Sequence, residues 1–249
     1  MQRWSPSLDS AVSGKWFATT HWSVVLAAGQ EESPQAAEAL GQLGQTYWYP
    51  LYAYVRREGH SAHDAQDLTQ GFFARLLERK DLQSVHPQKG KFRSFLLASL
   101  KHFLANEWDR TQAVKRGAAY QFVSWDAADA ERRYGQEPSH GLTADRLFER
   151  RWALTLLEKT LEDLKQKRAA DGKAEWFDAL QVYLSGGPNA RPYAEIAAEL
   201  GMSEGALKVA VHRLRRRYGE LMRKEIAHTV SRLEDIDDEI RHLFAVVAA

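Results

Sequence analysis

The segment "YAEIAAELGMSEGALKVAVHRLRRRYGEL", residues 193–221, contains two stretches of helical periodicity that meet at Gly201. In the second stretch the apolar side chains recur every three or four residues, which places them on one side of a helix: Leu207, Val211, Leu214, Tyr218 and Leu221. Gly201 suits a tight turn because glycine tolerates a positive φ, and Ser203 suits the N-cap of the second helix. The pattern predicts a helix-turn-helix, whose second helix can lie in the major groove of DNA.

Positive charge is concentrated on this second helix. Between Glu204 and Lys224, seven basic residues stand against two acidic ones, a balance of +5 in a chain whose formal total is +1. Neutralising DNA phosphates needs such a concentration of cations. The candidate DNA-binding residues here are Ser203, Lys208, Val209, His212, Arg213, Arg215 and Arg216. The alternative interpretation is a solvated basic helix that only packs through its apolar side.

The rest of the chain also favours helices. Strand-like alternation is almost absent, and Ser61 and Asp64 have the spacing of a capping box that opens another helix. The chain contains no cysteine, which excludes disulfides and thiolate zinc sites and fits a reducing compartment. The helical periodicity predicts an all-α protein. No apolar run is long enough to span a membrane and no secretory signal is evident, so we expect the protein to be cytoplasmic.

Turn signals and charge divide the chain into five parts. We predict an N-terminal extension (1–32), a first helical domain (33–116), an acidic linker (117–144), a second helical domain with the helix-turn-helix (145–228) and an amphipathic C-terminal extension (229–249). From Asp126 to Asp145, five acidic and two basic residues give the linker a balance of −3. The C-terminal extension carries five acids between Glu234 and Glu239. It either packs with its acidic side solvated or folds back on a basic DNA-binding face and regulates it.

Two further segments, taken together with residues 193–221, resemble parts of a known family. "DAQDLTQGFFARLLE" (64–78) and "KFRSFLLASLKHFLANEWDR" (91–110) precede the 193–221 segment along the chain. Together the three segments resemble the extracytoplasmic-function (ECF) subfamily of bacterial RNA polymerase sigma factors. The resemblance covers roughly residues 34–116 and 145–226. It implies a protein that binds core RNA polymerase and directs promoter recognition and DNA melting in transcription initiation.

In the first of these segments, the resemblance implies a surface that binds core polymerase. Asp64 and Asp67 share a helix face, and Gln70 also matches the family pattern. By resemblance, their partner is the clamp coiled coil of the largest polymerase subunit. Gly71 departs from the pattern, which usually has Glu there. The alternative for Asp64 is that its carboxylate only caps the helix.

The second segment is similar to the sigma-factor helix that melts and reads the −10 promoter element. Seven basic residues and two acidic ones lie between Lys89 and Arg116, a local balance of +5. A basic track and a base pocket are what melted single strands require. The candidate contacts are Arg93, Lys101, His102 and Arg110. His102 lies where the family often has an Asn that holds a flipped base; an ordinary solvated histidine is the alternative.

The resemblance implies core RNA polymerase and promoter DNA as partners, with a double-stranded −35 region and a melted −10 region. Binding to these partners would be controlled by an inhibitory anti-sigma protein or by the C-terminal extension of the chain itself. Because the sequence has no Walker loop, nucleophile elbow or H-E-x-x-H motif, we expect no catalytic residues, cofactor or metal. A stand-alone helix-turn-helix transcription regulator is the principal alternative, and a purely protein-binding adaptor is a third.

Overall fold

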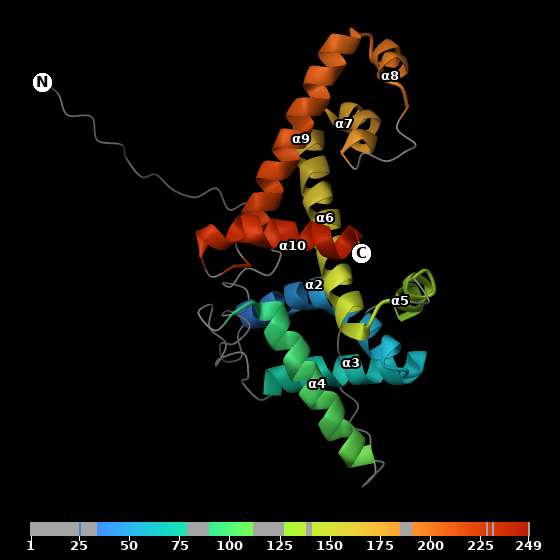
Figure 1. The fold of residues 1–249 in the computed structure, drawn as a ribbon, viewed down its shortest axis with the longest axis vertical. Helices are drawn as coiled ribbons and strands as arrows, with labels where there is room; N and C mark the ends of the chain where they lie inside the picture. Colours follow the sequence, from blue (N-terminus) through green and yellow to red (C-terminus); the bar gives the residue numbers. More distant parts are fainter. Residues whose placement is uncertain are drawn as a thin grey trace, which may run out of the picture.

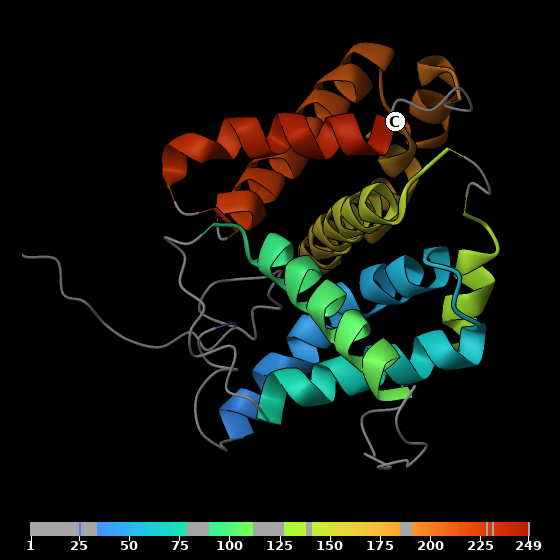
Figure 2. The same ribbon diagram turned by 60° about the horizontal axis from the view of Figure 1, so that its bottom comes forward.

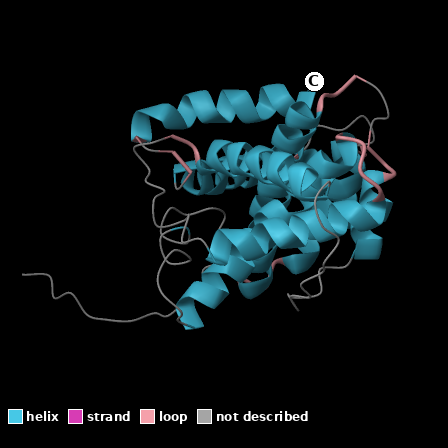
Figure 3. Ribbon diagram, turned by 90° about the horizontal axis from the view of Figure 1, so that it is seen from below, coloured by secondary structure: helices cyan, strands magenta, loops and turns pink. Residues whose placement is uncertain are grey.

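The computed structural model describes residue 25 and residues 34–78, 90–111, 127–137, 141–184, 191–227, 229–230 and 232–248. Every regular element within these ranges is a helix, and no strand occurs among them (Figure 3). The all-α prediction is therefore confirmed for the described part of the chain. The N-terminal extension, apart from Val25, lies outside the described residues.

Nine α-helices and two short 3₁₀ turns make up the regular structure of the described residues (Figure 1). In chain order they are α2 (Pro34–Arg57), α3 (Ala62–Glu78), α4 (Phe92–Thr111), α5 (Ala127–Tyr134), α6 (Ala144–Ala170), α7 (Ala174–Leu180), η3 (Gln181–Tyr183), α8 (Tyr193–Glu199), α9 (Glu204–Ala227), η4 (Leu233–Asp235) and α10 (Ile236–Ala248). No helix in these ranges is both long and apolar enough to cross a membrane.

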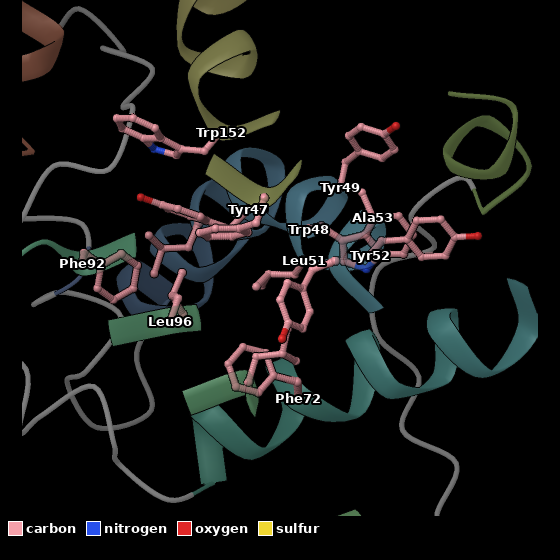
Figure 4. Close-up of a cluster of buried hydrophobic side chains, with 14 of the residues drawn as sticks. Tyr47, Trp48, Tyr49, Leu51, Tyr52, Ala53, Phe72, Phe92, Leu96 and Trp152 are labelled. Atoms are coloured by element: carbon pink, nitrogen blue, oxygen red, sulfur yellow. The ribbon is translucent and has the colours of Figure 1, made fainter. Parts of the chain in front are cut away.

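The first hydrophobic core is built on α2 and is rich in aromatic side chains (Figure 4). Tyr47 meets Phe92 of α4 edge to face, with ring centroids 5.5 Å apart. Phe72 of α3 and Trp152 of α6 belong to the same core and are almost fully buried. The sequence pattern assigns four apolar residues to the interior of α3, namely Ala65, Leu68, Phe72 and Leu76. Three of them are buried, and Leu68 packs against the core from a half-buried position.

The second core forms at the other end of the molecule, between α6, α7, α8 and α9. Leu164, Phe177, Ile196 and Leu207 are its buried representatives from these four helices. The predicted apolar side of α9 lies in this core, since Leu207, Val211, Leu214 and Leu221 are all buried. Tyr218 packs against it from a half-buried position.

Two helices pass through both cores. Helix α6 contributes Phe148 and Trp152 to the first core and Leu164 to the second, and α9 contributes Leu214 to the second core and Ile226 to the first. The range 145–228, predicted as a separate C-terminal domain, thus shares the first half of its first helix with the core around α2.

The predicted linker contains α5, which is attached to α2. Glu131 accepts hydrogen bonds from Arg56 and from the Tyr52 hydroxyl, at 2.7 Å and 2.5 Å. Glu137 accepts a hydrogen bond from the Tyr49 hydroxyl at 2.6 Å and is 8% exposed. These two linker acids are therefore bound to the body of the protein; residues 112–126 and 138–140 lie outside the described residues.

Helix α10, from the predicted C-terminal extension, lies across α6 and α9 (Figures 1 and 2). Leu243 is fully buried, and Ile236, Ile240 and Val247 pack against the first core. Glu239 is also buried, with 1% of its surface exposed, although most of the acids around it face solvent. The extension therefore packs as a helix whose acidic side is solvated except at Glu239.

Trp152 provides a test of this architecture, because it is 1% exposed and belongs to the helix that joins the cores. We expect Trp152→Ala to lower the free energy of unfolding by about 3–5 kcal/mol, since it leaves a large cavity. Urea unfolding measures the change. Trp176→Ala on α7 is the matched control: that side chain is 38% exposed, and its loss should cost about 1 kcal/mol or less. Equal losses would contradict the packing described.

Candidate nucleic-acid interface

Helices α8 and α9 meet at a short turn that fixes the direction of α9. Gly201 has a φ of 63°, in the left-handed region that favours glycine. Ser203 caps α9, because its Oγ accepts a hydrogen bond from the Ala206 backbone N–H at 3.2 Å. Ile196 and Ala197 of α8 share the second core with the buried side of α9. The turn and the cap predicted from the sequence are both present.

The opposite side of α9 faces solvent. Lys208, Val209, His212, Arg213 and Arg216 are all exposed, and they recur at the spacing of one helix face. Val209 is 50% exposed although it is apolar. We name this set the α9 basic face. It combines three cations with one imidazole and one aliphatic side chain, a composition suited to phosphates and to the methyl group of thymine.

Two cations of the α9 basic face, Lys208 and Arg216, have partners on their own helix. Lys208 Nζ lies 2.6 Å from Glu204, and this hydrogen bond raises the pKa of Lys208. Arg216 and Arg217 both pair with Glu220, at 3.0 Å and 3.1 Å, and these hydrogen bonds lower the pKa of the Glu220 carboxyl. Exposed pairs of this kind contribute little to stability. A DNA phosphate can therefore replace these carboxylates without any movement of the backbone.

Arg215 differs from its neighbours, because its guanidinium binds the protein. Its Nε and Nη2 donate to the Tyr183 carbonyl oxygen at 3.0 Å and 2.8 Å. The Tyr183 ring stacks on Tyr193 of α8, with centroids 4.6 Å apart. Arg215, predicted to contact DNA, is thus the residue that ties α9 to the end of α7 and η3.

The predicted polymerase-binding residues lie on α3, at the other end of the molecule from α8 (Figure 1). Asp64 accepts a hydrogen bond from the Ser61 hydroxyl at 2.7 Å, and its backbone N–H donates to that oxygen at 3.1 Å. Asp67 pairs with His63 at 3.2 Å. Both carboxylates are exposed, and Gln70 is half-buried one turn further on. Ser61 therefore caps the helix, and the Asp64 carboxylate binds the capping hydroxyl while it still presents its charge to solvent.

Gly71 of α3 lies close to the Phe103 side chain of α4. A Cβ atom at this position would lie 3.4 Å from Cζ of Phe103. A Cβ atom would therefore be in van der Waals contact with that ring, and the longer side chain of a glutamate would have to point past it. The departure from the family pattern at Gly71 thus coincides with a close contact between helices.

The α4 candidates have unequal access to solvent, and Arg93 requires a correction. It is 3% exposed, its Nε donates to Glu149 at 2.8 Å, and its Nη1 donates to Glu239. Its guanidinium also lies 4.0 Å from the centre of the Trp152 ring. In this conformation Arg93 cannot contact DNA, because its guanidinium is buried and donates hydrogen bonds to two carboxylates.

Lys101 and His102 remain exposed on α4. Lys101 Nζ pairs with Asp145 at 2.8 Å, which links α4 to the first turn of α6. Arg110 belongs to α4, but its side chain lies outside the described residues. The structure therefore brings Lys101 and His102 together on one exposed stretch and separates them from Arg93.

Sequence reasoning missed the residues that bind Arg93, namely Glu149 and Glu239. A signal for Glu239 exists in the spacing: it lies three residues after Ile236 and four before Leu243, on the apolar stripe of α10. No comparable signal identifies which cation it would meet. Among the described residues, no group of three or more histidines and acids could hold a metal ion.

Comparisons with protein-family models, curated proteins and solved structures give no match to this chain.

The two neighbouring arginines on α9 separate a positioning role from a surface role. Arg215→Ala removes a charged donor from the Tyr183 carbonyl and should lower the free energy of unfolding by about 1 kcal/mol. Arg216→Ala removes only an exposed pair with Glu220 on the same helix and should leave stability nearly unchanged. Urea unfolding of both variants tests this. An Arg215 variant as stable as the Arg216 variant would refute the positioning role.

Proposed function

We propose that this protein is an RNA polymerase sigma factor of the ECF type, which binds core polymerase and directs promoter recognition and DNA melting. The observation that carries the proposal is the α9 basic face: a capped helix, fixed by a glycine turn, whose exposed side presents Lys208, Arg213 and Arg216. The helical architecture and the resemblance of three separate segments support it. The polymerase does the chemistry, and this cytoplasmic subunit supplies the promoter address.

On this proposal, α9 enters the major groove of the −35 element. Lys208, Arg213 and Arg216 neutralise phosphates, and Val209 contacts a thymine methyl group. His212 has ring nitrogens that can bond to a base edge. Because the three cations of this face are assigned to phosphates, phosphate contacts and duplex shape carry a large share of the recognition.

The acidic side of α3 serves the second partner. Asp64 and Asp67 are exposed, and each has acceptor capacity left beyond its local hydrogen bond. Two carboxylates three residues apart present one negative patch to a basic surface of core polymerase. On α4, Lys101 and His102 are the residues available to a melted strand.

Promoter-specific transcription in vitro tests the proposal directly. The protein, added to core polymerase and promoter fragments, should give initiation at defined sites, while the free protein binds promoter duplex weakly. Tight binding of a dimer to an operator without polymerase would instead support a stand-alone helix-turn-helix regulator.

Binding to core polymerase should depend on the charge of α3. The double variant Asp64→Asn/Asp67→Asn keeps an acceptor for the Ser61 hydroxyl but removes both charges, so we expect affinity for core to fall about tenfold or more. The matched control is Asp171→Asn/Glu175→Gln, which removes two exposed charges near the start of α7. Equilibrium binding to core polymerase measures both. Equal affinity of the two variants would show that Asp64 and Asp67 act only within α3.

Duplex binding should depend on salt through the α9 basic face. Each Ala substitution of Lys208, Arg213 or Arg216 should reduce the slope of log affinity against log salt by about 0.9, because one phosphate contact is lost. Arg132→Ala is the control, since Arg132 is 75% exposed and pairs with Asp129 on its own helix, away from α9. An unchanged slope in the three α9 variants would exclude phosphate contacts by this face.

A further inference from the structure

Helix α10 pairs its carboxylates with cations from two different helices. Glu239 Oε2 lies 2.5 Å from Lys91 Nζ, and the other oxygen accepts a hydrogen bond from Arg93 Nη1. Asp237 lies 2.6 Å from Arg223 Nη1, near the end of α9. Figure 2 shows the start of α4 (green) near the junction between α9 and α10 (red). Helix α10 therefore neutralises cations on both segments that the proposed function assigns to DNA.

The pocket around Glu239 has the chemistry of a phosphate site. Each carboxylate oxygen of Glu239 contacts one cation, Lys91 or Arg93. Two basic side chains bind the two free oxygens of a phosphodiester in the same way. Burial raises the pKa of the Glu239 carboxyl, but Arg93 and Lys91 outweigh that effect, and the pKa lies below its ordinary value. The carboxylate is thus an anion at neutral pH.

The charge balance of this pocket depends on α10. Lys91 and Arg93 contribute two positive charges, and Glu149 and Glu239 contribute two negative ones. Without Glu239 the same pocket keeps Glu149 alone and carries one net positive charge. A buried guanidinium with incomplete compensation is unfavourable. When α10 leaves, the exposed cations therefore carry a net positive charge that attracts another anion.

Helix α10 is short, and few of its side chains are fully buried. It has 13 residues, a length at which an isolated helix is marginal in water. Only Leu243 and Glu239 of this helix are buried, and Phe244 is 49% exposed. Its docking thus relies on Leu243, on partly buried apolar neighbours, on the contact of His242 with Glu149 of α6 and on the ion pairs with Lys91, Arg93 and Arg223. Loss of Glu239 from its pocket removes one of the two buried attachments.

We infer that α10 is an autoinhibitory strap, in which Glu239 occupies a phosphate-binding site made by Lys91 and Arg93, and that the backbone of single-stranded DNA displaces it. The inference rests on the proposed function, which assigns α4 to a melted strand. In the closed form Arg93 is unavailable to DNA. In the open form Lys91 and Arg93 extend the basic track that begins at Lys101.

The test uses the full chain and a fluorescent single strand of twenty thymidines as the probe. Glu239→Gln keeps the size of the side chain and removes its charge, so it should bind the probe several-fold more tightly at low salt. Its slope of log affinity against log salt should be steeper by about 1.4, because two single-strand phosphate contacts are gained at about 0.7 each. Adding Lys91→Ala to this variant should remove about half of that gain.

Asp238→Asn is the matched control for this experiment. Asp238 precedes Glu239, is 73% exposed and pairs with Arg241 on the same helix. This variant should bind the probe like the wild type. A Glu239→Gln protein with wild-type affinity and slope overturns the inference, and so does a failure of both proteins to bind the probe at low salt.

A measurement on the unmodified protein does not depend on how well the variant folds. Amide hydrogen exchange within residues 236–248 should accelerate when the wild type is saturated with the probe, because α10 leaves its site. Unchanged protection in the bound state overturns the inference. These results are separate from those for polymerase: a displaced α10 without promoter-specific initiation would refute the sigma-factor proposal alone, and initiation with α10 still protected would refute the strap alone.

Discussion

The buried guanidinium of Arg93 constrains the arrangement of three helices. A cation that is 3% exposed needs compensating charge, and here it comes from Glu149 of α6 and Glu239 of α10, while the Trp152 ring covers one face. Helices α4, α6 and α10 must therefore keep fixed relative positions for this one side chain to be satisfied. Helix α6, which carries Glu149, also packs against α9, the helix that bears the basic face, and both helices contribute to both hydrophobic cores.

Two kinds of ion pair occur among the described basic residues. On α9, Lys208 pairs with Glu204, and Arg216 and Arg217 pair with Glu220, all within the same helix. Arg93, Lys91 and Arg223 instead pair with acids on other helices. When a phosphate replaces the carboxylate of a local pair, no contact between helices is lost. A buried long-range pair, such as Arg93 with Glu239, can be replaced only if the helix that carries the acid moves.

The sequence predicted helices and their buried sides well, because periodicity and caps are local properties. Gly201, Ser203 and the apolar side of α9 occupy their predicted roles, and α6 begins within one residue of Asp145. The sequence did not predict which distant segments would pair. Positive charge near "KFRSF" suggested a DNA contact at Arg93, yet its position three residues before Leu96 places it on the buried side of α4. Likewise, the acids of the predicted linker gave no indication that Glu131 and Glu137 would bind α2.

If the chain acts as a sigma factor, these two classes of ion pair impose an order on DNA binding. The α9 basic face can exchange its local carboxylates for phosphates in the closed form, so duplex recognition needs no rearrangement. The cations at the start of α4 are occupied until α10 moves, so capture of a melted strand needs one. Duplex contact therefore comes first and strand capture second. The free energy that holds Glu239 in its pocket then sets how readily the second step follows, and it keeps the free protein from binding single strands indiscriminately.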